Sequence, residues 1–130
     1  MTINQLTLTN FGIFQGEQVL RFDTSGAERP IVLIGGENGR GKTTILESVF
    51  LVLYGKLSPF VPSGKSYASY LRKRVNDGAD DGIAAISVTL EHLVDGQPCL
   101  LEVRRAWSRD TPERKDELVV TRDGSDDAWL

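Results

Sequence analysis

The feature that most limits what this chain can fold into is one eight-residue segment, residues 36–43, with the sequence GENGRGKT. Its spacing, Gly-x-x-x-x-Gly-Lys-Thr, lets glycine backbones turn so that successive N–H groups converge on one anion. Residues 31–34 (IVLI) precede it as an apolar run without polar alternation, which is typical of a strand covered on both faces. A helical pattern follows from about Lys42 to Tyr54, and Gly55 is placed to end it. This order of strand, loop and helix predicts a phosphate-binding loop.

The segment has the chemistry of an ATP and Mg²⁺ site. Lys42 can reach the β- and γ-phosphates, and the hydroxyl of Thr43 can ligate Mg²⁺. A glycine-rich turn without a ligand is the alternative, and the strand before the loop and the helix after it argue against that alternative. We predict that the phosphates are bound by Gly36, Asn38, Gly39, Arg40, Gly41, Lys42, Thr43 and Thr44, with Thr43 as the metal ligand.

The helix after the loop carries apolar residues at helical spacing, from Ile45 to Leu53. Leu51 and Val52 widen its apolar face, so the pattern predicts a helix buried on most sides.

Most of the remaining chain alternates apolar and polar residues at the two-residue period of half-buried strands. The pattern predicts strands around Leu6 and Leu8, at residues 18–22, from Ile83 onward, after a hairpin turn at Asp95-Gly96, and at residues 118–122. Ser66 can cap a short helix that runs to about Val75. The predicted fold class is therefore α/β: a P-loop lobe with a parallel core strand, its helix and an antiparallel β-sheet.

Composition restricts the partners and the cellular location that we expect for this chain. The 130 residues carry a formal net charge of −3, which gives no global attraction to nucleic acid. A single cysteine, Cys99, excludes an internal disulfide and fits a reducing cytosol. No apolar run approaches the roughly 20 residues of a membrane span, and the N-terminus lacks the pattern of a signal peptide. We predict a cytoplasmic protein without a membrane partner.

Two groups of basic residues could each have one of two roles. Arg72, Lys73 and Arg74 could contact a DNA backbone, but a solvated helix face is favoured. Arg104 and Arg105, near Trp107, could form a cation–π contact, but an ordinary strand edge is favoured.

Four further residues are predicted to have no part in the chemistry. His92 has no second metal ligand at suitable spacing, and Cys99 is interpreted as a small buried apolar group. Gln97 is interpreted as a turn residue, and Glu47 as helix surface or packing.

Several short segments resemble the ATP-binding heads of the Rad50, structural-maintenance-of-chromosomes (SMC) and RecF-like ATPases. They are Leu6-x-Leu8-x-Asn10-Phe11, Asn38 within the loop, and Ile45-Leu46-Glu47 after it. The resemblance covers the whole chain and implies that residues 1–130 are the N-terminal lobe of an ABC-type ATPase head within a longer protein. It also implies that two heads form a head-to-head homodimer around ATP, and that DNA is bound through the full-length protein or its complex.

Within that group the chain is most similar to the DndD family of DNA phosphorothioation proteins. The likeness rests on NFG at residues 10–12, GEQ at 16–18, RPIVLIGG at 29–36, LYG at 53–55 and SYASYLR at 66–72. It implies an ATPase that works with other DNA-modification proteins; the alternative is a Rad50- or RecF-like DNA-repair head. Many Rad50-like heads carry an arginine after Asn-Phe that approaches the nucleotide. Gly12 stands there in this chain, so that contact is not carried over.

The sequence has no Walker B run ending in Asp-Glu and no Leu-Ser-Gly-Gly-type signature. We therefore predict no catalytic residue within this chain and no ATP hydrolysis by it alone. A small-molecule P-loop kinase and a non-catalytic nucleotide-binding module are further alternatives.

Overall fold

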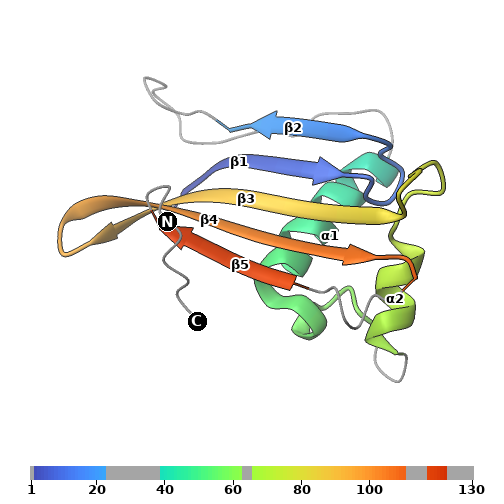
Figure 1. Cartoon of the computed structure of the whole chain (residues 1–130). Coiled ribbons are helices and arrows are strands. Elements are labelled where there is room, and N and C mark those ends of the chain that lie inside the picture. Colours follow the sequence, from blue (N-terminus) through green and yellow to red (C-terminus); the bar gives the residue numbers. More distant parts are fainter. Residues whose placement is uncertain (1, 23–38, 63–65, 111–116, 123–130) are drawn as a thin grey trace.

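A five-stranded sheet in the order β2-β1-β3-β4-β5 forms one layer of the molecule (Figure 1). The computed structural model describes residues 2–22, 39–62, 66–110 and 117–122. Every neighbouring pair of strands is antiparallel. The strands are β1 (Thr2–Thr9), β2 (Glu17–Arg21), β3 (Ile83–Val94), β4 (Gln97–Ser108) and β5 (Glu117–Arg122).

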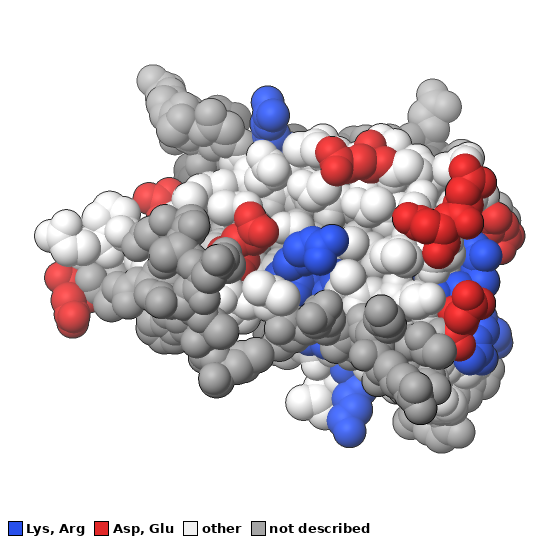
Figure 2. All heavy atoms as spheres, in the orientation of Figure 1, with Lys and Arg blue, Asp and Glu red and all other residues white. Residues whose placement is uncertain are grey.

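The predicted alternation is confirmed in the register of the sheet. Leu6 of β1 pairs with Leu20 of β2 and with Val88 of β3, so apolar side chains share one face. On that face Leu6 and Val88 are fully buried. The other face carries polar residues such as Thr7 and Ser87, which pair with each other. Figure 2 shows this outer face, which is mostly uncharged over its described part.

The β3–β4 turn follows the Asp-Gly prediction. Asp95 has a φ of 52° and Gly96 a φ of 79°, the two positive values that a type I′ hairpin requires. The turn is shorter than predicted, because Gln97 already pairs with Val94 as the first residue of β4.

Helix α1 (Gly39–Tyr54) lies across the inner face of the sheet (Figure 1). It begins three residues before the predicted Lys42, because the Gly-Arg-Gly segment already forms its first turn. It ends at Tyr54, because the φ of 58° at Gly55 stops the helix there, as predicted. The following turn is a short 3₁₀ segment, η1 (Gly55–Leu57).

The prediction that α1 is buried on most sides is wrong for one stripe. Leu51 and Val52 are fully buried against the sheet, but Leu46 is 52% exposed and Tyr54 is 55% exposed. The reason is geometric, since a sheet covers only the side of a helix that rests on it. Within the described part of the chain, no element covers the opposite side at Leu46 and Tyr54.

Helix α2 (Tyr67–Lys73) begins at the predicted cap. The hydroxyl of Ser66 accepts a hydrogen bond from the backbone N–H of Ser69 at 3.3 Å. The helix ends before the predicted Val75, because Val75 forms an isolated β-bridge with Phe11 instead.

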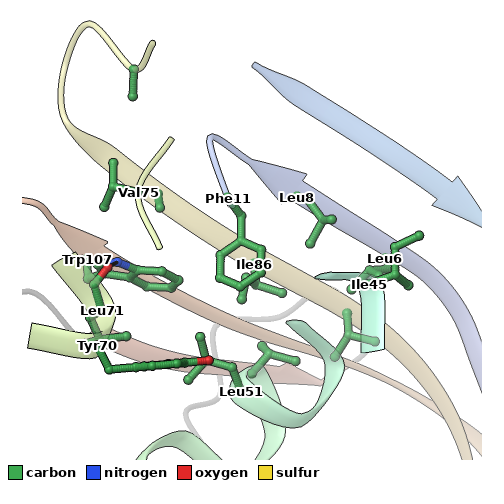
Figure 3. Close-up of a cluster of buried hydrophobic side chains, with 14 of the residues drawn as sticks. Leu6, Leu8, Phe11, Ile45, Leu51, Tyr70, Leu71, Val75, Ile86 and Trp107 are labelled. Atoms are coloured by element: carbon green, nitrogen blue, oxygen red, sulfur yellow. Dashed lines mark hydrogen bonds between the residues drawn. The ribbon is translucent and has the colours of Figure 1, made fainter. Parts of the chain in front are cut away.

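Phe11 and Trp107 form the centre of the core between the sheet and the helices (Figure 3). Their rings meet edge to face with centroids 5.9 Å apart. The indole N–H of Trp107 donates to the carbonyl of Leu71 at 2.8 Å, which ties α2 to β4.

The strand-edge interpretation of Arg104 and Arg105 is wrong. Strand β4 lies between β3 and β5, so neither residue is at an edge. Arg105 points to the inner face and is 8% exposed, with its guanidinium against Gly55 at the end of α1. A cation there also faces the negative end of the helix dipole.

The predicted strand at residues 31–34 lies outside the described residues. None of the helices in the described ranges is long and apolar enough to cross a bilayer.

Candidate nucleotide-binding site

The predicted phosphate-binding residues fall at the start of α1. Gly36 and Asn38 lie outside the described residues, and the next four residues form the backbone of the first helical turn. Thr43 follows with an exposed side chain, and Thr44 is buried at 8% exposure. The structure therefore places the following predicted residues together at one helix end: Gly39, Arg40, Gly41, Lys42, Thr43 and Thr44.

This helix end can receive an anion. The first N–H groups of a helix have no partners within it, and the helix dipole adds positive potential at the same end. The first turn of α1 contains no acidic residue that would repel phosphate. Because Thr43 is exposed, its hydroxyl is accessible to a metal ion bound to that phosphate. The described residues thus fit ATP with Mg²⁺.

The turn after β1 touches this helix end. Gly12 has a φ of 59°, and a Cβ atom there would lie only 2.9 Å from Cγ2 of Thr44. Glycine is required by both the backbone conformation and this close approach. In the sequence Gly12 stood out only as the place of a missing arginine; the contact with Thr44 depends on the tertiary fold.

Asn10 closes that turn and fixes its position. Its side-chain oxygen accepts from the backbone N–H of Gly16 at 2.8 Å, and its amide group donates to the carbonyl of Ile83 at 3.1 Å. Its own carbonyl accepts from the N–H of Asn76 at 2.8 Å. We call residues 10–16 the Asn10 turn. It is held between α1 and the segment that follows α2.

Glu47 is the residue whose environment sequence reasoning missed. It is 4% exposed, and its carboxylate lies 2.8 Å from Nε of Arg74 and accepts a hydrogen bond from the hydroxyl of Tyr70. A carboxylate within an otherwise apolar helix pattern needs a partner when buried, and that signal could have found it. Burial and the hydrogen bond to Glu47 raise the pKa of Tyr70 well above its ordinary range, so the hydroxyl stays a donor.

The basic group on α2 does not act as one surface. Arg74 turns to Glu47 with a side chain 40% exposed, so the solvated-face interpretation is wrong for it. Lys73 is exposed as predicted, and the Nε of exposed Arg72 donates to the carbonyl of Arg109 at 3.1 Å.

The remaining predictions concern metal and cysteine. His92 is exposed near the β3–β4 turn, and the described residues hold no group of three metal-binding side chains. Cys99 is 2% exposed, which confirms the interpretation of a buried apolar group.

An open hollow of about 290 Å³ lies elsewhere, beside the Asn10 turn. Two of its lining residues, Asp80 and Asp81, carry carboxylates that would repel a polyphosphate. We therefore do not assign nucleotide to it. Its lining consists of Asn10, Gln15, Gly16, Gly78, Asp80 and Asp81.

Known proteins are similar to this chain in sequence and in fold. A family described as "AAA domain" matches residues 5–127. The chain is 33% identical over 93 residues to the DNA replication and repair protein RecF of Shewanella frigidimarina, covering 71% of this chain and 20% of that protein. It is 42% identical over 52 residues to the SbcC component of the nuclease SbcCD of Treponema pallidum, covering 40% of this chain and 5% of that protein.

Among solved structures, the SMC head domain from Thermotoga maritima superposes with a TM-score of 0.53 at 19% identity. The match covers 96% of this chain and 38% of that one, so the fold is that of the N-terminal half of an ATPase head. The chain therefore belongs to the AAA domain family, and it is similar to part of proteins of the RecF, SbcC and SMC kind.

Proposed function

We propose that this chain is the ATP-binding lobe of an SMC-like ATPase that acts on DNA. The observation that carries the proposal is the start of α1 within the glycine-rich segment, with exposed Thr43 and no acidic residue in its first turn. Backbone N–H groups of the loop would hold the phosphates, Lys42 would neutralise the β- and γ-phosphates, and Thr43 would ligate Mg²⁺. Bound Mg²⁺ supplies charge neutralisation across those two phosphates.

Hydrolysis needs groups from outside this chain. The chain spans about a fifth of the RecF relative and 38% of the solved SMC head. Exposed apolar residues on and after α1, with Leu57 80% exposed, support a missing covering lobe. We propose that this lobe supplies the general base and that a second head supplies further charge stabilisation. On this proposal the chain alone binds ATP without turnover, and ATP binding pairs two heads.

The finer role we propose is DNA phosphorothioation, with cysteine-desulfurase and sulfurtransferase partners doing the sulfur chemistry. It is supported by the segments that resemble the DndD family, among them residues 10–12 and 66–72. The alternative is a DNA-repair head, and the name of the RecF relative, a DNA replication and repair protein, favours it. In either role DNA would be contacted by the whole protein or its complex. A cytoplasmic location stays a prediction.

The first test is Lys42→Ala in the host, with phosphorothioate in genomic DNA measured by mass spectrometry. If the proposal holds, the modification is lost, because the β- and γ-phosphates lose their cation. Lys56→Ala is the matched control, since Lys56 is an exposed lysine at the other end of α1 and should leave the modification intact.

Unchanged sulfur content with a folded, expressed Lys42→Ala protein would contradict the modification role. Survival after DNA damage, measured in the same strains, separates the alternative: a repair head predicts sensitivity of the Lys42→Ala strain without any change in DNA sulfur.

A further inference from the structure

A cluster formed by Glu47, Tyr70 and Arg74 joins α1 to α2, and the proposed phosphate chemistry does not use it. Glu47 lies one helical turn after Thr43, so its side chain is on the same side of α1 as that residue. Tyr70 belongs to α2, and Arg74 is the C-cap of α2. Figure 3 shows Tyr70 reaching from α2 toward α1.

The contacts within the cluster meet at one oxygen atom. Oε2 of Glu47 accepts the hydroxyl of Tyr70 and lies 2.8 Å from Nε of Arg74. The guanidinium carbon of Arg74 also lies 5.3 Å from the centre of the Tyr70 ring, within the range of a cation–π contact. Among the described residues, the carboxylate of Glu47 on α1 is thus contacted by Tyr70 of α2 and by Arg74 at the C-cap of α2, of which Arg74 carries the compensating charge.

Arg74 reaches α1 by a second route through its backbone. Its carbonyl accepts the N–H of Gly12 at 2.8 Å, and Gly12 lies so close to Thr44 that a Cβ atom added there would be 2.9 Å from its Cγ2. One residue after α2 is therefore connected to α1 at Glu47 through its side chain and at Thr44 through the Asn10 turn. Thr44 and Glu47 are three residues apart, so both connections reach the same turn of α1.

Stability alone is a weak reason for such a pair. Burying the Glu47 carboxylate costs free energy that an apolar side chain of the same shape would not, and Arg74, 40% exposed, compensates it only in part. What a directed ion pair with one buried partner adds is a fixed geometry between the elements that carry it, as a functional site needs from its supporting residues.

We propose that Glu47 and Arg74 are positioning residues for the nucleotide: their contact sets where the phosphate-binding end of α1 lies relative to the Asn10 turn. The inference rests on the proposed function, because it needs phosphate to bind at that helix end. Neither residue touches the nucleotide.

The test is nucleotide affinity, measured with a fluorescent ATP analogue and Mg²⁺ on the protein as its host expresses it. Glu47→Gln keeps the shape of the side chain and an oxygen for Tyr70, and Arg74→Gln removes the cation. Each should raise Kd roughly tenfold, because misplaced binding groups lose affinity steeply. The double variant should be no weaker than either single variant, since both remove the same contact.

Two matched variants separate positioning from a general charge or folding effect. Lys73→Gln makes the same charge change as Arg74→Gln at an exposed neighbour and should leave Kd unchanged. Arg74→Lys keeps the cation and should restore most of the affinity. Thermal unfolding without nucleotide is recorded for each variant, and Tyr70→Phe, which keeps the ring, replaces any variant that does not fold and should also weaken binding.

An unchanged Kd in folded Glu47→Gln, or two single effects that multiply in the double variant, would overturn the inference. Lys42→Ala distinguishes this failure from that of the proposed function. If Lys42→Ala abolishes binding while the Glu47 and Arg74 variants bind normally, only the positioning role is wrong. If wild-type protein binds no nucleotide, the proposed function is wrong and the inference falls with it.

Discussion

At the residue scale, single atoms decide how closely the Asn10 turn can approach α1. Gly12 and Gly16 both have positive φ, at 59° and 75°, but their surroundings differ. A Cβ at Gly12 would meet Thr44, whereas nothing lies within 4 Å of one at Gly16. The two glycines therefore separate the cost of backbone strain from the cost of a collision.

Alanine at each position measures the two costs. We expect Gly16→Ala to lower the free energy of unfolding by about 1 kcal/mol through left-handed strain. Gly12→Ala should cost about 2 kcal/mol or more, because it adds the clash with Thr44. Urea unfolding of both variants checks this, and the ATP affinity should fall only for Gly12→Ala. If Gly12→Ala and Gly16→Ala lower the free energy of unfolding equally, the Thr44 side chain moves aside at no energetic cost.

At the scale of elements, local sequence signals predicted the strands and helices well, and the errors have physical causes. The Asp95-Gly96 turn and the Ser66 cap are short-range devices, so they could be predicted. The end of α2 could not, because Val75 leaves the helix for a bridge to Phe11, far away in sequence. The partners of Glu47 and the burial of Arg105 are likewise set by tertiary packing.

The hydrogen bond from Trp107 to Leu71 gives the prediction at this scale. Trp107→Phe keeps an aromatic ring beside Phe11 but removes the indole donor, so the Leu71 carbonyl keeps only the N–H of Arg74, at 3.1 Å. We expect the free energy of unfolding to fall by about 1 kcal/mol, and amide hydrogen exchange to quicken in α2 more than in β3. Val119→Ala, at a residue 41% exposed on the outer face of β5, is the control and should change α2 little.

At the scale of the whole molecule, apolar side chains are exposed on two surfaces. The outer face of the sheet mixes polar residues such as Thr7 with exposed apolar ones such as Val19 and Val119. The exposed side of α1 carries Leu46 and Tyr54, with Leu57 just beyond. Sequence periodicity could not distinguish the two sides of α1, because the residues that are exposed on one side and the residues that pack against the sheet are equally apolar.

Replacing that exposed side tests whether another lobe covers it. Leu46→Gln with Leu57→Gln should leave the unfolding midpoint of the 130-residue chain nearly unchanged, because both side chains already face water. In the protein as its host expresses it, the same pair should lower the midpoint by several degrees. Leu51→Ala, in the core, should lower both. If the two Gln substitutions shift the unfolding midpoint equally in the 130-residue chain and in the protein as its host expresses it, a covering lobe is contradicted.

The pairing of β1 with β3 also governs the order in which the chain can fold. Thr7 pairs with Ser87, so the centre of the sheet cannot close until the ribosome has released both helices and the first half of the β3–β4 hairpin. Until then β1 has one neighbour, and Leu6 and Leu8 face water beside an unpaired strand edge. Helix α1 is therefore synthesised before the sheet it rests on is complete, and a chain that stops before β3 would present an aggregation-prone edge.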